Sequence, residues 1–397
     1  MKNKHFISSS KLITILIIIL VTAGILIFPQ EVLTSSKKGI QLWFNTLFPS
    51  LFPFMVATYL LIELGVVHFI GIIFEPVMGP IFNVPGEGAF PWIMGLISGY
   101  PMGAKISSDL RSKGKISQIE AQRLVSFTNN SGPLFILGAV SAGMLSKPEI
   151  GVFLLIVHYL SSLTVGILFS FYKREKSIKR KKYKNIIKKS LNQLLIIQKT
   201  NSKKIGLILK ESILNSMETI VQIGGFVIVF SVISQLLELS SLLNLSTKLL
   251  KPFFNTIGLN PNLISSLVLG IIEITNGISR ISLNSSTICQ ELALVSFLIA
   301  FGGISVLMQT ITVISSSDIN ILVYSYSKLI QGLIAFIYSI LLYPQFVKIT
   351  SYSQSVFKTV SDSFTNNLWF KIGPYFCASI CILFIIININ IFQSNKN

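Results

Sequence analysis

Long apolar runs separated by short polar stretches set the pattern of this 397-residue chain. A helix rises about 1.5 Å per residue, so about 20 apolar residues cross the hydrocarbon core of a bilayer. Runs of roughly this length predict transmembrane helices over 12–28, 45–66, 123–145, 150–172, 214–239, 291–314, 322–345 and 369–392. Two shorter runs, 88–104 and 263–281, are interrupted by glycine, proline or charge. Two more, 67–84 and 242–257, are typical of helices at the membrane interface.

The irregular runs recur at matching places in the two halves of the chain. Five landmarks follow one another at an offset that drifts only from 175–176 to 170 residues. They pair Glu63-Leu64 with Glu238-Leu239, Pro76 with Pro252, Pro85 with Pro261, Gly95-Leu96-Ile97 with Gly270-Ile271-Ile272, and Leu124-Val125-Ser126-Phe127 with Leu294-Val295-Ser296-Phe297. The sequence therefore predicts a duplication, with a first repeat at 41–172 and a second at 211–346.

Basic residues indicate how the two copies are oriented. Residues 173–210 hold fourteen Lys and Arg against one acid, and basic residues also precede the first apolar run and outnumber acids in 105–122. Because basic loops stay on the cytoplasmic side, all three lie together only if 88–104 enters and leaves the membrane on one face. Each repeat then has three spans and one hairpin, which turns the second copy upside down.

These observations predict the fold class. We expect an all-α polytopic membrane protein with two inverted repeats, each of about three transmembrane helices plus one re-entrant or broken hairpin. Residues 1–40 hold an extra N-terminal span, which we expect to remain uncleaved because no small-residue cleavage site follows it. Residues 173–210 form a basic cytoplasmic loop, and 347–397 hold a loop and a C-terminal span. Paired broken segments in inverted repeats are typical of secondary transporters.

Composition narrows the classes of function. The chain is 51% hydrophobic and 12% charged, where a soluble domain has about a quarter charged residues. The net charge of +18 is concentrated in the 173–210 loop, where Tyr183 is the single aromatic residue, and this favours contact with lipid headgroups over nucleic acid. Catalytic signatures and ligand clusters for a metal are missing from the sequence, so we predict no enzyme, no metal and no cofactor.

The first interrupted run has the composition of a substrate site. Backbone that leaves the helix at membrane depth is tolerated where it lines a cavity, and glycine lets it approach a ligand closely. The candidate substrate-binding residues are Ser98, Tyr100 and Lys105, and the candidate hinge residues are Gly99, Pro101 and Gly103. The alternative is a proline-kinked packing hairpin in which Lys105 extends to the interface.

The second interrupted run carries ionisable groups inside a membrane segment, which mark functional sites by default. The candidates there are Glu273, Thr275, Asn276 and Arg280, with Gly277 as a hinge residue. Glu273 and Arg280 are seven apart and share one helix face, about 10 Å apart. Glu273 is therefore either a substrate contact or the partner of Arg280 or Lys105 in an ion pair between the hairpins.

Three adjacent polar residues interrupt the third span of the first repeat. Asn129, Asn130 and Ser131 precede the candidate hinge residue Pro133, whereas the second repeat has apolar residues and glycine at 299–303. This asymmetry favours a substrate contact, with hydrogen bonding between helices as the competing role. His158, alone in an apolar span, is expected to be a packing residue.

Four motifs in order resemble a known family. They are LFPSLFPF at 47–54, SGYPMGAK at 98–105, SFTNNSGPLFILGAV at 126–140 and GIIEITNG at 270–277. Together they resemble sporulation integral membrane proteins of the YlbJ type, which have two nucleoside-recognition "Gate" domains. The resemblance covers about 40–345.

The resemblance implies a protein of the outer forespore membrane that passes dipicolinic acid towards the forespore and supports cortex formation. Such an aromatic dianion would suit Lys105, Arg280, the asparagine amides and helix N-termini. The implied partners are the lipid bilayer, the small anionic substrate and, left open, other sporulation membrane proteins. The alternatives are a nucleoside-type transporter and a non-transporting membrane scaffold, for which the 173–210 loop would be the essential part.

Overall fold

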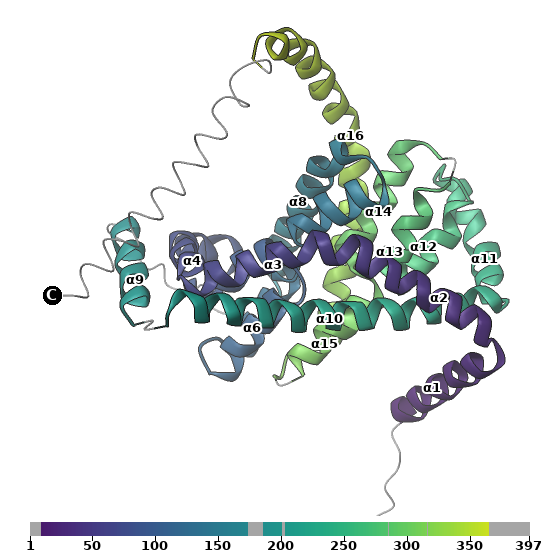
Figure 1. Ribbon diagram of the computed structural model, residues 1–397, viewed down its shortest axis with the longest axis horizontal. Coiled ribbons are helices and arrows are strands. Elements are labelled where there is room, and N and C mark those ends of the chain that lie inside the picture. The colour runs from purple at the N-terminus through teal and green to yellow at the C-terminus, as the bar shows by residue number, and fades with distance from the viewer. Residues whose placement is uncertain (1–8, 174–185, 201–202, 285, 316, 365–397) are drawn as a thin grey trace, which may run out of the picture. The chain divides into compact units, whose positions relative to one another are not determined.

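The computed structural model describes residues 9–173, 186–200, 203–284, 286–315 and 317–364, and every regular element in these ranges is a helix (Figure 1). The first repeat and the segment before it contain α1 (Ser9–Ile27), α2 (Pro29–Leu42), η1 (Trp43–Leu47), α3 (Phe48–Glu63), α4 (Val66–Val77), η2 (Met78–Phe82), η3 (Gly86–Gly88), α5 (Ala89–Ser98), α6 (Met102–Ser112), α7 (Gln118–Thr128), η4 (Phe135–Met144), η5 (Pro148–Ile150) and α8 (Gly151–Phe169). The rest contains α9 (Ile186–Thr200), α10 (Ile205–Leu239), α11 (Leu242–Thr256), α12 (Leu263–Ile272), α13 (Ile274–Ile281), α14 (Ile288–Phe301), α15 (Gly303–Ile314) and α16 (Ile321–Phe364).

Helices long and apolar enough to cross a membrane confirm the polytopic class. Within the described residues there are five: Pro29–Glu63, Pro148–Phe169, Ile205–Leu239, Ile288–Ile314 and Ile321–Lys348. A sixth candidate is the pair Phe69–Phe82 and Gly86–Ser98, which is bent by 110°. The predicted first span appears as α1, whose apolar part is the shorter Ile15–Ile27. The predicted span 369–392 lies outside the described residues.

Two expected spans are broken, and the sequence explains both breaks. The run 123–145 divides into α7 and η4, because Asn129 is extended and Pro133 follows it. The run 291–314 divides into α14 and α15 at Gly302 and Gly303, which have φ of 87° and 74°. Such left-handed backbone favours glycine. The run 291–314 still forms the candidate span Ile288–Ile314 despite this break, whereas 123–145 yields only the shorter apolar helix Phe135–Met144. Hydropathy alone does not register a break inside an apolar run.

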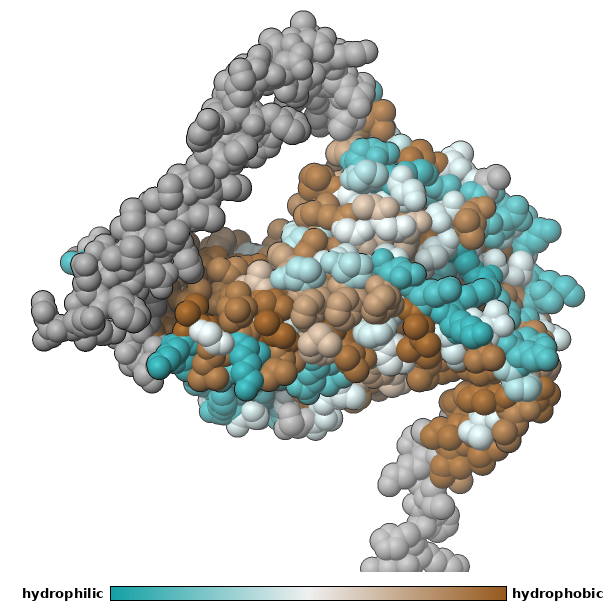
Figure 2. Space-filling view, in the orientation of Figure 1, coloured by the Kyte–Doolittle hydropathy of each residue, from teal (hydrophilic) through white to brown (hydrophobic). Residues whose placement is uncertain are grey.

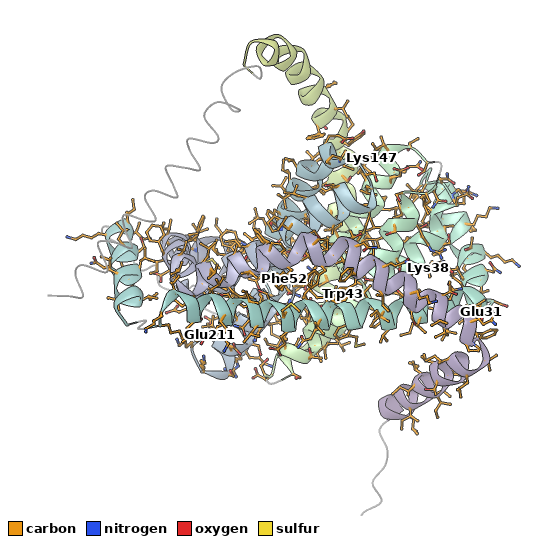
Figure 3. All side chains as sticks on the ribbon, in the orientation of Figure 1. Glu31, Lys38, Trp43, Phe52, Lys147 and Glu211 are labelled. Carbon is orange, nitrogen blue, oxygen red and sulfur yellow. The ribbon has the colours of Figure 1, made fainter. Side chains whose placement is uncertain are left out.

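A long helical run, Pro29–Glu63, lies along α10 (Figure 1). Trp43, labelled in Figure 3, contacts α10 from this run. Its indole N–H donates to the Ile220 carbonyl at 2.9 Å, and Gly224 leaves room for the ring. Nearer the start of the run, Ser35 donates to the Ser231 carbonyl at 2.7 Å. The run also crosses residues 40 and 41, so the helix continues through the predicted start of the first repeat.

Each short interrupted run forms a tight helical hairpin whose arms meet at glycines. In α5 and α6, a β-carbon on Gly95 or Gly103 would lie 1.6 or 2.0 Å from the Thr128 carbonyl oxygen. In α12 and α13, a β-carbon on Gly277 would lie 2.2 Å from the Gly270 Cα. The glycine requirement in both places explains why Gly95 and Gly270 align in the two repeats. The expectation of a broken hairpin in each repeat is thus confirmed.

Large apolar side chains remain exposed on several helices, which is the surface that lipid would cover. They include Leu20 and Leu26 of α1, 62% and 76% exposed, and Leu322 of α16, 70% exposed. Figure 2 shows hydrophobic residues gathered on α1. Without lipid, such an area would be an aggregation surface in water, and this supports an integral membrane protein.

The predicted basic loop contains a helix. α9 packs against α4, and Lys189 forms an ion pair of 2.8 Å with Glu75. Lys203 contacts Glu63 at 3.3 Å and Glu211 at 2.6 Å, and these two acids raise its pKa. Part of the basic segment therefore docks on the first repeat, although its sequence alone suggested a plain loop.

An exposed ion pair ties the first hairpin to the segment before α16. The Arg111 guanidinium donates to both oxygens of Asp318 at 2.8 and 2.7 Å, and this lowers the pKa of the Asp318 carboxyl. A lowered folded pKa adds stability above the ordinary carboxyl pKa, and that stability is lost as pH falls through the lowered value.

We therefore expect Asp318→Asn to lower the melting temperature slightly at neutral pH and to leave it unchanged in strong acid. Thermal unfolding in detergent measures this difference. Asp109→Asn is the control, because Asp109 forms no ion pair within the described ranges. A difference that persists in acid would contradict the role of the ion pair.

Candidate functional site

The first hairpin breaks at Gly99 and Pro101. Gly99 has φ 79° and ψ −166°, a conformation that is essentially confined to glycine, and it ends α5. Pro101 lacks a backbone N–H and precedes α6. The break directs Tyr100 towards α14 in the second repeat, where its hydroxyl donates to the Ile299 carbonyl at 2.9 Å. The residues predicted to be hinges thus carry Tyr100 from the first repeat to the second.

The second hairpin breaks at Glu273, which is extended and 2% exposed. Its carboxylate accepts from the backbone N–H of Asn276 at 2.8 Å and from the Thr275 hydroxyl, so that it caps the N-terminus of α13. A carboxylate there is stabilised by the helix dipole. The described residues provide no basic partner for Glu273, and the proposed ion pair with Arg280 or Lys105 is absent.

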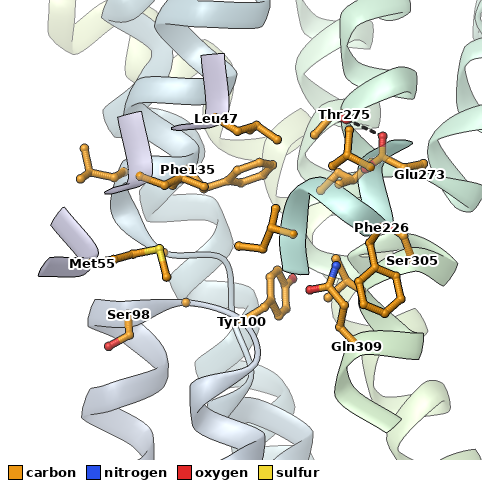
Figure 4. A pocket seen from close by; sticks show the side chains of 18 of the residues that line it. Leu47, Met55, Ser98, Tyr100, Phe135, Phe226, Glu273, Thr275, Ser305 and Gln309 are labelled. Atoms are coloured by element: carbon orange, nitrogen blue, oxygen red, sulfur yellow. Dashed lines mark hydrogen bonds between the residues drawn. The ribbon is translucent and has the colours of Figure 1, made fainter. Parts of the chain in front are cut away.

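The two breaks face one cavity of about 90 Å³ (Figure 4). Its polar lining comes from both hairpins, from the α7–η4 break and from α15: Ser98, Gly99, Tyr100, Gly132, Glu273, Thr275, Ser305 and Gln309. The remaining wall is apolar and includes Phe54, Phe135 and Phe226. We call this space the central cavity. Ser305 and Gln309 were not predicted, because they lie in a run that reads as an ordinary span.

Backbone carbonyls released by the helix breaks are satisfied by side chains from other helices. The Ile299 carbonyl accepts from Tyr100 and, at 3.3 Å, from the Ser131 hydroxyl. The Leu96 carbonyl accepts from the Tyr159 hydroxyl at 2.6 Å. Unpaired carbonyls would be costly away from water. The donors therefore let helices end in the interior of the protein.

The three polar residues after α7 join a buried network and do not line the central cavity. The Asn129 amide donates to Thr310 at 2.9 Å and to Tyr324 at 2.6 Å, and Asn130 donates to Ser162 at 3.0 Å. The Ser131 backbone N–H donates to His158 Nε2 at 3.0 Å. These contacts are the hydrogen bonds between helices that competed with a substrate role, which stays a prediction.

The network also contains a lysine that sequence reasoning missed. Lys328 of α16 is 0% exposed and donates to the Asn129 carbonyl at 2.8 Å and to Gln331 at 2.5 Å. Gln331 in turn donates to Asn130 Oδ1 at 3.1 Å. A single lysine in the apolar run 322–345 was the available signal, since intramembrane ionisable groups mark functional sites.

A second, polar cavity of about 540 Å³ lies beside α13, and Arg280 lines it. Arg280 forms an ion pair with Glu238 of α10, and Lys38 of α2 is also part of the wall. Asn276 lines this cavity too, and its amide donates to Ser231 of α10 at 3.1 Å. The hairpin residues Thr275 and Asn276 therefore face different cavities.

The predicted site residues thus do not form a single site. Ser98, Tyr100, Glu273 and Thr275 meet at the central cavity, together with the predicted hinge residue Gly99. Lys105 is exposed and lines neither cavity. Its role in substrate binding stays a prediction, to which this placement adds no support.

A helical membrane protein with two halves and paired broken hairpins is the class that this fold and site define. The chain belongs to the Gate (nucleoside recognition) family, whose model matches residues 44–172 and 220–342. It is 36% identical over 390 residues to the sporulation integral membrane protein YlbJ of Bacillus subtilis (strain 168), covering 94% of this chain and 95% of that protein. The family resemblance drawn from the four motifs is thereby confirmed.

Solved structures of CNTnw are also similar to this chain. A double variant in an outward-facing state has 13% identity and a TM-score of 0.44, covering 84% of this chain and 86% of that one. CNTnw in an inward-facing substrate-bound state has 14% identity and a TM-score of 0.41, with coverage of 83% and 84%.

Proposed function

We propose that the protein is a transporter that moves a small anionic metabolite across the outer forespore membrane, and that its substrate is dipicolinic acid. The observation that carries this proposal is the central cavity, to which the breaks of both hairpins contribute side chains. In secondary transporters the substrate binds between repeats, at discontinuous helices. Transport by alternating access of inverted repeats would serve spore maturation and cortex formation, and the name of the relative YlbJ places that protein in sporulation.

Ring-shaped anions suit the central cavity in two ways. Phe54, Phe135 and Phe226 offer apolar surface to a planar ring. The first turns of α13 and α15 contribute Thr275 and Ser305 to the wall, and helix N-termini favour negative charge. The Glu273 carboxylate is engaged in capping α13, which reduces its repulsion of an anion.

The polar second cavity supports an anionic substrate as well. Lys38 and Arg280 give it two cationic groups against the acid Glu238. Thr275 and Asn276 are neighbours on α13 and line different cavities, and the Asn276 amide is held by its bond to Ser231. We propose that this cavity attracts the anion before it reaches the central cavity.

One observation favours the alternative of a nucleoside-type substrate. The wall of the central cavity contains no lysine or arginine, whereas Ser98, Thr275, Ser305 and Gln309 offer neutral hydrogen-bonding groups. Neutral groups of this kind suit an uncharged ring with hydroxyls. The family description, nucleoside recognition, points the same way.

Uptake into proteoliposomes separates the two substrates. Purified protein is reconstituted, and uptake of labelled dipicolinate and labelled uridine is compared with uptake by protein-free liposomes. We expect protein-dependent uptake of dipicolinate that exceeds that of uridine. Uptake of uridine alone would replace the proposed substrate by a nucleoside, and uptake of neither would count against transport.

Removing one of the two basic groups of the second cavity is expected to slow uptake at low substrate concentration. Arg280→Ala takes away one of two cations, so we expect a KM for dipicolinate raised several-fold with a smaller change in the maximal rate. Lys113→Ala is the control for loss of a positive charge, because Lys113 is exposed and lines neither cavity. Equal KM values in the two variants would contradict a role for the second cavity.

A further inference from the structure

Lys328 is a buried cation that has no carboxylate partner within the described ranges. It lies in α16, within the candidate span Ile321–Lys348. An ionisable group at such a place is costly and calls for a functional explanation. The proposed uptake of the substrate does not involve this residue.

The surroundings of Lys328 solvate its charge without neutralising it. An ammonium group has three N–H donors and no acceptor. Two donors meet the Asn129 carbonyl and Gln331 Oε1, and the Tyr100 ring lies with its centroid 5.5 Å from the Lys328 Nζ. All three partners are electron-rich and uncharged, so they favour the ammonium form electrostatically, and none of them cancels its charge.

Tyr100 connects this charge with the central cavity. The residue lines the cavity, whereas Lys328 does not, and its ring is in contact with the Lys328 ammonium. Charges act over longer distances in a protein interior than in water, because the effective dielectric constant is lower. The Lys328 ammonium is separated from the central cavity by the Tyr100 ring, and it therefore raises the electrostatic potential inside the cavity.

We propose that Lys328 selects the charge of the substrate. Acting across the Tyr100 ring, it makes the central cavity favour a ring compound with carboxylates over an uncharged compound of the same shape. This inference rests on the proposed function, and it supplies the cation that the cavity wall lacks. Lys328 is thus a specificity-determining residue that needs no direct contact with the substrate.

The test compares two ligands that differ in charge but hardly in shape. Binding of pyridine-2,6-dicarboxylate and of pyridine-2,6-dicarboxamide is measured on the full-length protein in detergent by titration calorimetry. We expect the wild type to prefer the dicarboxylate at least about tenfold. Lys328→Met should abolish this preference, and Lys328→Arg should keep it.

A second variant addresses the risk that Lys328→Met fails to fold. Gln331→Glu places a carboxylate where Gln331 Oε1 now accepts from Lys328 at 2.5 Å, so it neutralises the charge while retaining the lysine. We expect Gln331→Glu also to lose the preference while still binding the dicarboxamide. A role confined to packing would weaken both ligands equally.

The outcomes separate this inference from the proposed function. A wild-type preference for the dicarboxylate that survives in Lys328→Met or in Gln331→Glu would overturn the role of Lys328 and leave the proposed substrate standing. A wild type that binds the dicarboxamide as tightly as the dicarboxylate, or that binds neither, would overturn the anionic substrate and this inference with it.

Discussion

Replacing Gly95 by alanine is expected to prevent stable folding of the first hairpin. A β-carbon at this position would lie 1.6 Å from the Thr128 carbonyl oxygen, which is backbone and cannot move aside like the end of a side chain. Gly103 approaches the same oxygen from α6, so the hairpin has no free direction in which to shift. Overpacking usually costs about 1–3 kcal/mol, and a clash with backbone on both sides should exceed that.

The yield of monodisperse protein and its melting temperature in detergent measure this effect. Gly225→Ala is the matched control, because nothing lies within 4 Å of a β-carbon at that position of α10. Alanine is also the better helix former, by about 1 kcal/mol. A Gly95→Ala protein as stable as Gly225→Ala would mean that α5, α6 and the end of α7 do not pack as described.

Filling the central cavity is expected to abolish uptake without unfolding the protein. Gln309 lines the cavity from α15, and a tryptophan at this position would occupy the space between the hairpins. Transport requires a ligand to enter that space, so we expect Gln309→Trp to reduce dipicolinate uptake to the level of protein-free liposomes.

The neighbouring residue provides the control for Gln309→Trp. Met308 is 46% exposed on the same helix and does not line the cavity. Met308→Trp should therefore retain uptake, and both variants should melt near the wild-type temperature. Normal uptake by a folded Gln309→Trp protein would show that the substrate takes another route.

The breaks of the two hairpins were predictable because their cause is local. Glycine and proline interrupt 88–104, and the aligned Gly95 and Gly270 mark the close contacts of both hairpins. The exposed position of Lys105 could also have been predicted. Gly103 and Ser107 are four residues apart and face the interior, so a residue midway between them lies on the opposite side of a helix with 3.6 residues per turn.

Other features depend on long-range contacts that a pattern does not specify. The sequence offers several acids as ion-pair partners for Arg280. Its pairing with Glu238 depends on the packing of α13 beside α10, which the sequence pattern does not specify. Lys328 reaches the first repeat through the Asn129 carbonyl, a group that is available only because α7 ends there. A single lysine lowers the mean hydropathy of an apolar run only slightly, so the run still predicts an ordinary span.

Protection of a cysteine in the central cavity would show whether dipicolinate binds between the two hairpins. Ser305 is 2% exposed and lines the cavity, so Ser305→Cys in a background without native cysteines places a reporter in the proposed substrate site. The rate of its modification by a small thiol reagent is measured in proteoliposomes with and without dipicolinate. We expect slower modification when dipicolinate is present and no effect of the dicarboxamide at the same concentration. An unchanged rate with dipicolinate would contradict a substrate site between the two hairpins.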